Sequence, residues 1–176
     1  MELTNPINIS VSIIIVNYRT PSLTLACIDS IYAHTKGVDF EVIVVDNNSD
    51  DDSVERLSKD NRIILIESLR NGGFGYGNNL GMKVARGKYF FLLNSDTLLV
   101  NNAIKEFYDY AESHEPKTLY GCYLIGDDGT YRGSFHYFPA LTIGVFFRIL
   151  FCKQNYTPDY TDKEVECICG ADMFIP

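Results

Sequence analysis

Residues 11–20 read VSIIIVNYRT, and this stretch decides the fold class of the chain. The run at 11–16 is apolar and mostly β-branched, which is typical of a strand buried on both faces. The pair Thr20-Pro21 indicates a helix start, because Pro is favoured at the first helical position. We therefore expect a buried strand that leads into a helix ending near His34. The residues expected on the buried face of that helix are Leu23, Ala26, Cys27 and Ile31.

The same alternation of strand and helix continues along the chain. Further strands are expected at 41–45, 62–67 and 89–93, and further helices at 53–59, 77–86 (ended by Gly87) and 102–113. Such alternation specifies a parallel sheet with helices on both faces. Beyond Pro116 the pattern changes, and the turn Gly126–Gly129 between 119–125 and 130–135 predicts a hairpin. The predicted fold class is α/β: a Rossmann-like, mostly parallel sheet with late antiparallel strands, in a single domain spanning 1–176.

Composition excludes several classes of protein. With 176 residues, 46% hydrophobic and 22% charged, the chain resembles a soluble globular protein with one buried core. A net charge of -8 argues against a nucleic-acid groove, which needs surplus Lys and Arg. The five cysteines lack CxxC spacing, so we expect reduced, mostly buried thiols in a cytoplasmic protein. Residues 1–10 do not resemble a signal peptide, and the apolar segment Ala140–Cys152 is shorter than the roughly 20 residues of a membrane span.

Three polar clusters follow predicted strands, at 17–20 (NYRT), 46–48 (DNN) and 94–96 (NSD). Each cluster alone is also explained as a cap or a turn. In an open parallel sheet, however, ligands bind in the crevice beyond the carboxyl ends of the strands. The three clusters together therefore predict a ligand site at that edge.

The individual side chains suggest roles within such a site. Asp96 is a candidate ligand for a hard cation, Mg²⁺ or Mn²⁺, which would also bind the diphosphate oxygens of a ligand. The alternative role of Asp96 is to cap the N-terminus of the next helix. Asp46 can accept hydrogen bonds from a base N–H or a ribose hydroxyl. Tyr18 offers a ring on which a base can stack, with core packing as the alternative.

The segment 71–81, NGGFGYGNNLG, is rich in glycine, as a loop that approaches phosphate or ribose would be. A dinucleotide fingerprint is the rival explanation. The spacing is Gly75-x-Gly77-x-x-x-Gly81 rather than GxGxxG, and the first strand-to-helix turn at 17–20 contains no glycine. A phosphate loop of the GxxxxGK[ST] type is absent from the sequence.

Four stretches, in this order, resemble a known family: VSIIIVNYRT (11–20), EVIVVDNNSD (41–50), NGGFGYGNNLG (71–81) and ARGKYFFLLNSDT (85–97). As a set they resemble the family 2 inverting glycosyltransferases of the GT-A fold, and within it the rhamnosyltransferase-like branch of bacterial polysaccharide assembly. The resemblance implies a UDP- or dTDP-sugar donor, a saccharide or lipid-linked saccharide acceptor, and Mn²⁺ or Mg²⁺.

The resemblance also implies roles by position. Tyr18 and Asp46 match the residues that hold the base, and the 71–78 segment matches the one beside the ribose and sugar. Asn94-Ser95-Asp96 stands at the DXD motif, so Asp96 matches the acid that binds the metal–diphosphate. Asn94 replaces the first acid, which lowers the expected metal affinity. The residues expected to bind the sugar nucleotide are Asn17, Tyr18, Thr20, Asp46, Asn48, Asn71, Gly73, Asn78, Asn94, Ser95 and Asp96.

The last residues, 170–176 (GADMFIP), resemble the family's strand beneath the acceptor site. In relatives the general base follows this strand, so we expect the chain to be the N-terminal part of a longer enzyme, with the base beyond Pro176. Asp172 is a minor candidate for that base. A nucleotide-dependent oxidoreductase and a non-catalytic nucleotide-binding module stay open as alternatives. So does contact of Ala140–Cys152 with a membrane surface, against internal packing.

Overall fold

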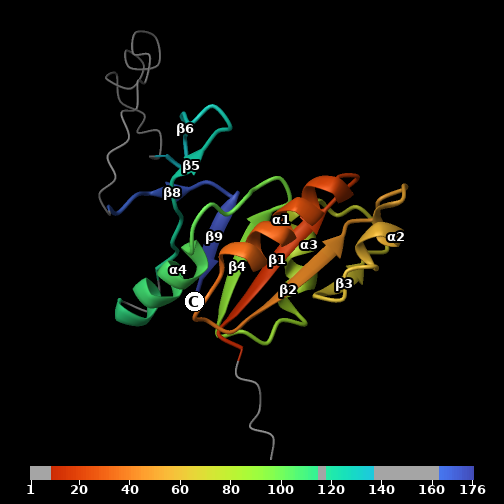
Figure 1. The fold of residues 1–176 in the computed structure, drawn as a ribbon, viewed down its shortest axis with the longest axis horizontal. Helices are drawn as coiled ribbons and strands as arrows, with labels where there is room; N and C mark the ends of the chain where they lie inside the picture. Colours follow the sequence, from red (N-terminus) through yellow and green to blue (C-terminus); the bar gives the residue numbers. More distant parts are fainter. Residues whose placement is uncertain (1–8, 115–117, 137–162) are drawn as a thin grey trace, which may run out of the picture. The chain divides into compact units, whose positions relative to one another are not determined.

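The computed structural model describes residues 9–114, 118–136 and 163–176 (Figure 1). The chain divides into two compact units, the first made of Met1–Tyr120 with Gly170–Pro176 and the second of Gly121–Cys169. The segment Ala140–Cys152, for which a buried helix or a membrane contact was considered, lies outside the described residues. That the whole chain acts as a single domain stays a prediction.

The first unit contains a five-stranded sheet in the order β3-β2-β1-β4-β9. Four strands are parallel, and β9 lies antiparallel beside β4. The strands are β1 (Val11–Asn17), β2 (Phe40–Asp46), β3 (Ile63–Glu67), β4 (Tyr89–Asn94) and β9 (Asp172–Ile175). The predicted mostly parallel α/β sheet, with its late antiparallel strand, is confirmed.

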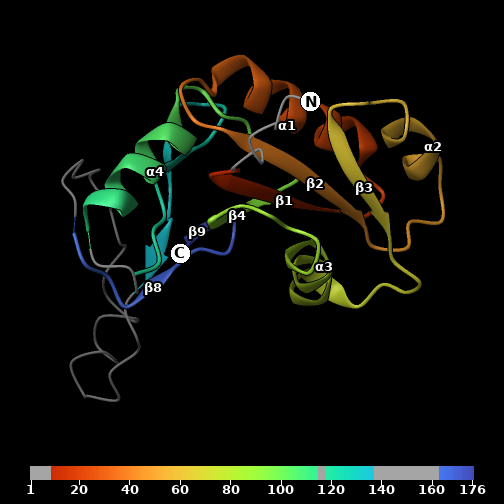
Figure 2. The ribbon, with the colours of Figure 1, turned by 90° about the horizontal axis from the view of Figure 1, so that it is seen from below.

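Helices cover both faces of this sheet, with α1 and α4 on one side and α3 on the other (Figure 2). The helices are α1 (Pro21–His34), α2 (Ser53–Leu57), α3 (Gly73–Met82) and α4 (Ala103–Ser113). Phe107 of α4 packs against Phe174 and Phe91, with ring centroids 5.3 and 5.4 Å apart. On the opposite face, a cluster of buried side chains lies beneath α3: Ile14, Ile43, Val45 and Leu92. Burial on both faces explains why these strands are continuous apolar runs.

The buried face of α1 differs from the expected one. Leu23 is 49% exposed and Ala26 is also exposed, so the expectation that they are buried is wrong. Thr24 points inward instead, because its hydroxyl donates a hydrogen bond to Asn17 Oδ1 at 2.8 Å. The buried residues of the helix are Pro21, Thr24, Cys27, Ile28 and Ile31. Apolar periodicity missed this face because a polar side chain with a partner is part of it.

The glycine-rich segment forms most of α3, which begins at Gly73 and ends at Met82 rather than spanning 77–86. Two of its glycines allow the helix to lie close to the sheet. A Cβ at Gly77 would lie 2.8 Å from Val16 Cγ1, and one at Gly81 would lie 2.5 Å from Ile14 Cγ2. Gly87 does not end the helix, because α3 ends at Met82. Gly87 instead lies close to β1, where a Cβ would meet the Ser12 backbone nitrogen at 2.4 Å. Close packing therefore accounts for part of the glycine density.

The second unit contains two short antiparallel pairs. β5 (Leu124–Ile125) pairs with β6 (Tyr131–Arg132), and β7 (Phe135–His136) pairs with β8 (Cys167–Ile168). The predicted hairpin is confirmed, and the Gly126 amide donates to the Thr130 carbonyl across its turn at 2.8 Å. Its strands are shorter than expected, because Tyr120 belongs to the first unit and bridges to Phe174 of β9.

The cysteines within the described residues are free thiols but less buried than expected. The four described cysteines are free, and Cys27 is buried while Cys122, Cys167 and Cys169 are half-buried. The expectation of mostly buried thiols is wrong for these three, which lie in short strands and loops outside the main sheet. Cys152 lies outside the described residues.

A buried carboxylate holds β1, β2 and the start of β4 together at the amino edge of the sheet. Glu41 Oε1 accepts hydrogen bonds from Ser12 Oγ at 2.6 Å and from the Arg86 amide at 2.7 Å. Its Oε2 accepts from the Arg86 guanidinium at 2.6 and 2.9 Å. Burial opposes ionisation, but the hydrogen bonds from Ser12 and Arg86 outweigh it and hold the pKa of Glu41 below its usual range.

Acidification should therefore weaken the fold through Glu41. Because its pKa is lowered on folding, its stabilising contribution is complete above the usual pKa of 4.5 and is lost as the pH falls toward the folded value. At pH 7 we expect Glu41→Gln to lower the free energy of unfolding by about 1–3 kcal/mol. The difference between variant and wild type should shrink at pH 3, measured by urea unfolding. Glu55→Gln, in an exposed pair with Lys59, is the control and should change little at either pH. An equal loss for both variants would contradict the assignment.

Candidate nucleotide-sugar site

The strand order places a switch point between β1 and β4. The chain moves from β1 outward to β2 and β3, then crosses back to β4 on the other side of β1. Loops that leave neighbouring strands in opposite directions open a crevice beyond their carboxyl ends. Asn17 ends β1 and Asn94 ends β4, and the register pairs Val16 with Asn94. Two of the three predicted polar clusters therefore meet at this switch point.

Asn17 connects the first two clusters. It is fully buried, its Nδ2 donates to Asp46 Oδ1 at 2.7 Å, and the two residues are partners in the β1–β2 register. Its Oδ1 accepts hydrogen bonds from Thr24 at 2.8 Å and from Thr20 at 3.3 Å. Both polar atoms of the amide are thus engaged within the protein. Asn17 holds Asp46 and the start of α1 in fixed positions.

Ser49 is a member of this network that sequence reasoning missed. Its amide donates to Asp46 Oδ2 at 2.9 Å, and its hydroxyl accepts from the Arg19 amide at 2.9 Å. The signal was present, because Ser49 lies in the same polar turn as Asp46. A run of adjacent Asn, Asp and Ser commonly bonds its own turn, as these groups do here.

Backbone strain is concentrated at the same edge. Among the described residues, the non-glycine residues with positive φ are Arg19, at 57°, and Asn48, at 60°. The left-handed conformation costs a residue with a Cβ about 1–2 kcal/mol, and such residues collect at functional sites. Asn48 is exposed, and the Tyr18 side chain is 41% exposed, with the Arg19 guanidinium 5.3 Å from its ring centroid. Tyr18 is therefore not a core residue, and its free ring surface faces solvent.

The third cluster lies beside the first. Ser95 Oγ lies 3.4 Å from Thr20 Oγ1, which brings the loop after β4 to the start of α1. Asp96 follows in an exposed turn that the Thr97 amide closes onto the Asn94 carbonyl at 3.2 Å. The alternative that Asp96 caps the following helix is wrong, since α4 begins at Ala103.

Asp96 has the chemistry of a cation ligand. Asp96 is exposed, and in the described part of the chain its carboxylate makes no hydrogen bond or ion pair. No group of three or more His, Cys, Asp or Glu side chains is gathered in that part. Burial, and then the charge of Asp96, raise the pKa of the Cys27 thiol to about 12. The buried Cys27 thiol donates a hydrogen bond to the Asn94 carbonyl, with a sulfur–oxygen distance of 3.7 Å.

The glycine segment is attached to the second cluster through Asn47. Its side chain is buried and contacts Asn71, Gly72 and Gly73 at the start of α3. Asn78, in the same helix, is also buried, and its Nδ2 donates to the Phe74 carbonyl at 3.1 Å. Asn71 and Gly73 are thus brought to the carboxyl edge of β2, whereas Asn78 lies beneath the helix.

Asp172, the minor candidate for a general base, lies on β9 opposite Leu93 of β4. Its neighbour Ala171 accepts a hydrogen bond from the Asn94 amide at 2.9 Å, so β9 begins beside the third cluster. Asp172 is 1% exposed, however, and shares its face of the strand with the core residue Phe174. A substrate hydroxyl has no access to this carboxylate in the conformation described here.

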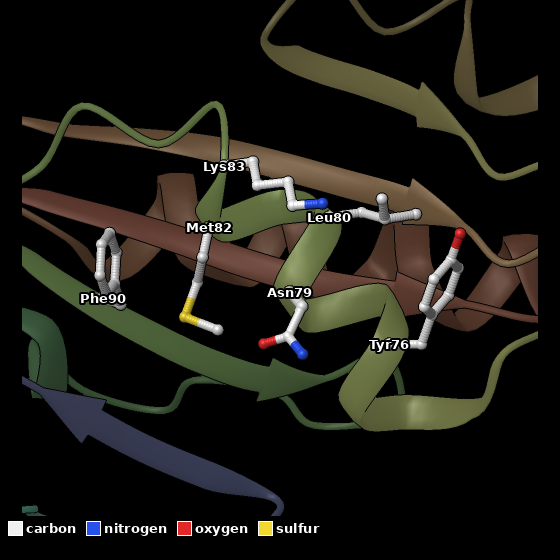
Figure 3. Close-up of a pocket in the computed structure, with 6 residues that line it drawn as sticks. All are labelled: Tyr76, Asn79, Leu80, Met82, Lys83 and Phe90. Atoms are coloured by element: carbon white, nitrogen blue, oxygen red, sulfur yellow. The ribbon is translucent and has the colours of Figure 1, made fainter.

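Two surface hollows lie away from these clusters. One, of about 480 Å³, lies between α3 and β4 and is shown in Figure 3. The other, of about 390 Å³, lies near the start of β4 and the end of α4. Neither includes any of the residues expected to bind a sugar nucleotide. The first is lined by Tyr76, Asn79, Leu80, Met82, Lys83 and Phe90.

A parallel sheet with polar loops meeting at its switch point places the chain in the class of doubly wound α/β proteins, which bind ligands at this edge. Within that class, residues 12–171 match the family described as Glycosyl transferase family 2. The match spans most of the chain, so the chain belongs to this family. The resemblance inferred from the four sequence stretches is confirmed, and the match leaves the oxidoreductase interpretation without support.

Individual relatives agree with this assignment. The chain is 29% identical over 167 residues to the Escherichia coli UDP-Glc:alpha-D-GlcNAc-diphosphoundecaprenol beta-1,3-glucosyltransferase WfaP, covering 88% of this chain and 66% of the relative. It resembles S. aureus TarS 1-349 in complex with UDP-GlcNAc, with a TM-score of 0.53, 26% identity, and coverage of 60% of this chain and 32% of that one. The mannosyltransferase PcManGT from Pyrobaculum calidifontis, in complex with GDP-Man and Mn²⁺, has a TM-score of 0.57 and 20% identity, with coverage of 66% and 38%.

The fold is therefore that of the GT-A glycosyltransferases, with a mostly parallel sheet and a few late antiparallel strands. The chain spans 43%, 18% and 66% of the length of three curated relatives that it matches. No helix among the described residues has both the length and the apolar character that crossing a bilayer requires.

Proposed function

We propose that the protein binds a UDP- or dTDP-sugar and transfers the sugar, with inversion, to an acceptor hydroxyl during polysaccharide or glycoconjugate assembly. The observation that carries the proposal is that three polar clusters, at Asn17–Thr20, Asp46–Asn48 and Asn94–Asp96, lie together at the carboxyl edge of the neighbouring strands β2, β1 and β4. Family membership supports it, since the relatives named above are glycosyltransferases.

The base and ribose are assigned to the β1 and β2 side of the crevice. The exposed ring of Tyr18 is the surface for base stacking. Each oxygen of Asp46 accepts one hydrogen bond inside the protein and retains a lone pair for a base N–H or a ribose hydroxyl. Because Asp46 is 1% exposed in this conformation, that contact requires the turn after β2 to move when the donor binds. Asn48, Asn71 and Gly73 lie beside it and are assigned to the ribose and sugar. Asn78, which is 2% exposed beneath α3, is assigned to supporting that helix rather than to contact with the donor.

The diphosphate is assigned to the β4 side, where Asn94, Ser95 and Asp96 meet Thr20. A cation bound by Asp96, Mn²⁺ or Mg²⁺, would offset the charge that develops on the leaving diphosphate. Asn94 keeps a hydrogen-bonding amide but adds no charge, so Asp96 alone supplies negative charge in the motif. The structural neighbour PcManGT is in complex with GDP-Man and Mn²⁺, which supports a divalent cation here.

Transfer with inversion needs in-line attack by the acceptor and a base that takes its proton. The 1% exposure of Asp172 in this conformation argues against this residue as the base. The acceptor is proposed to be a saccharide or a lipid-linked saccharide. The name of WfaP specifies a diphosphoundecaprenol-linked acceptor. By analogy, the proposed location of this protein is the cytoplasmic face of a membrane.

A thermal-shift screen tests the proposal. UDP-, dTDP- and GDP-sugars are added with Mn²⁺ or with a chelator, and the unfolding temperature is measured. A pyrimidine donor with Mn²⁺, at about 100 times its dissociation constant, should raise the unfolding temperature by roughly 5 °C or more. The chelator should remove most of that shift. No shift with any sugar nucleotide would contradict the proposal.

The same donor separates an enzyme from a binding module. The protein is incubated with the donor, the cation and a saccharide acceptor, and the products are analysed by mass spectrometry. We expect the donor to be consumed. A donor that raises the unfolding temperature but is never consumed would favour the non-catalytic module instead.

A further inference from the structure

Asn47 occupies an unusual place between two parts of the proposed site. It directly follows the last residue of β2, and its amide donates to the Asn17 carbonyl at 2.8 Å, so its backbone is fixed against β1. Side chains alternate along a strand, so Asn47 shares the face of Val45, which lies in the cluster beneath α3. Asp46 faces the other side. The buried side-chain amide of Asn47, just past the apolar residues of β2, therefore faces the start of α3.

The Asn47 side-chain amide forms hydrogen bonds with the residues at the start of α3. Asn47 Oδ1 accepts from the Gly72 amide at 3.2 Å, and its Nδ2 donates to Asn71 Oδ1 at 2.9 Å and to the Gly73 carbonyl at 3.3 Å. Asn71 Oδ1 also accepts from the Gly73 amide at 3.0 Å. The first amides of a helix have no partner within the helix, and Gly72 has no side chain to cap them. Asn47 and Asn71 replace the missing cap.

The backbone at Gly73, which Asn47 holds, has little packing around it. Gly73 has a φ of +81°, and a Cβ there would meet nothing within 4 Å, so this turn is held by hydrogen bonds rather than by packing around Gly73. The chain passes from β3 into α3 through this segment (Figure 2). Without the Asn47 amide, the segment would keep the Asn71–Gly73 bond and lose its connection to β2.

We infer that Asn47 is a positioning residue that fixes the Asn71–Gly73 segment relative to Asp46, and so sets the affinity for the sugar part of the donor. This rests on the proposed function, since Asp46 is assigned to the base and the Asn71–Gly73 segment to the ribose and sugar. Asn47 itself is buried and touches no substrate; it acts through the segment that it holds.

The test compares Asn47→Ala with a matched variant, Asn102→Ala. Asn102 also makes two hydrogen bonds to a distant backbone segment, at Lys36, but it lies at the start of α4. Titration calorimetry with UDP and with a UDP-sugar, both with Mn²⁺, gives affinities, and amide hydrogen exchange reports on Gly72 and Gly73. Asn47→Ala should bind the UDP-sugar about tenfold or more weakly, lose less affinity for UDP, and exchange faster at both glycines. Asn102→Ala should change neither.

A second variant, Asn47→Asp, distinguishes the loss of these hydrogen bonds from a general loss of folding. It keeps an acceptor for the Gly72 amide, and rotation of the Asn71 amide lets its Nδ2 donate to the new carboxylate. Slow exchange at Gly72 and part of the UDP-sugar affinity should return. If Asn47→Ala binds the UDP-sugar as tightly as wild type while Gly72 exchanges faster, the positioning role is overturned and the proposed function stands. If wild type itself binds no sugar nucleotide, both are overturned.

Discussion

Asp96→Ala should abolish the metal-dependent part of donor binding. The chain already carries a net charge of -8, so a diphosphate is repelled unless a cation compensates it. Asn94 supplies no charge, and the described residues contain no group of three or more His, Cys, Asp or Glu side chains that could hold a cation. We expect the affinity for UDP in the presence of Mn²⁺ to fall about a hundredfold, to the value that wild type shows with a chelator.

The control for this variant is Asp39→Ala. Asp39 is an exposed acid directly before β2, at the opposite edge of the sheet, and its removal changes the net charge by the same amount. It should leave UDP affinity within about twofold of wild type. Calorimetry that shows unchanged UDP affinity for Asp96→Ala with Mn²⁺ present would refute the assignment of Asp96.

Gly81→Ala should destabilise the protein strongly. Its Cβ would lie 2.5 Å from Cγ2 of Ile14, a fully buried, β-branched side chain in the central strand that has no room to rotate away. The helix must move off the sheet, so we expect the free energy of unfolding to fall by about 1–3 kcal/mol. Urea unfolding followed by circular dichroism measures the change.

Gly75→Ala, in the same helix, is the matched control. A Cβ there meets nothing within 4 Å, and Ala favours a helix over Gly by up to about 1 kcal/mol. We therefore expect a neutral or slightly stabilising effect. If Gly75→Ala and Gly81→Ala were equally destabilising, the glycines would be needed for backbone freedom rather than for close packing.

The order of strands and helices followed from sequence because the buried strands are apolar runs whose lengths leave few alternatives. The start of α3 did not. Its glycines have poor helix propensity and indicated a loop, yet packing of Gly77 and Gly81 against Val16 and Ile14 overrides propensity. Apolar periodicity likewise placed Leu23 on the wrong face of α1, because Thr24 is buried through a hydrogen bond to Asn17.

The edge of the sheet that carries the candidate site was predictable, whereas the side chains that turn inward there and those that face solvent were not. Asn17, Asp46 and Asn94 end their strands, and parallel strands bring such residues together. Which polar side chains turn inward depends on the backbone of the turns, including the left-handed Asn48, and on distant partners. For that reason Asn47 and Ser49 had no signal of their own beyond lying in the same turn as Asp46.

Backbone amide mapping by NMR tests most directly whether these loops form one site. UDP is titrated with Mg²⁺ into the protein, and shifts are compared between the two edges of the sheet. We predict shifts at Tyr18, Ser49 and Ser95 together, with Lys36 and Lys88 at the opposite edge unaffected. Shifts confined to one loop, or centred on the hollow between α3 and β4, would show that the nucleotide binds elsewhere.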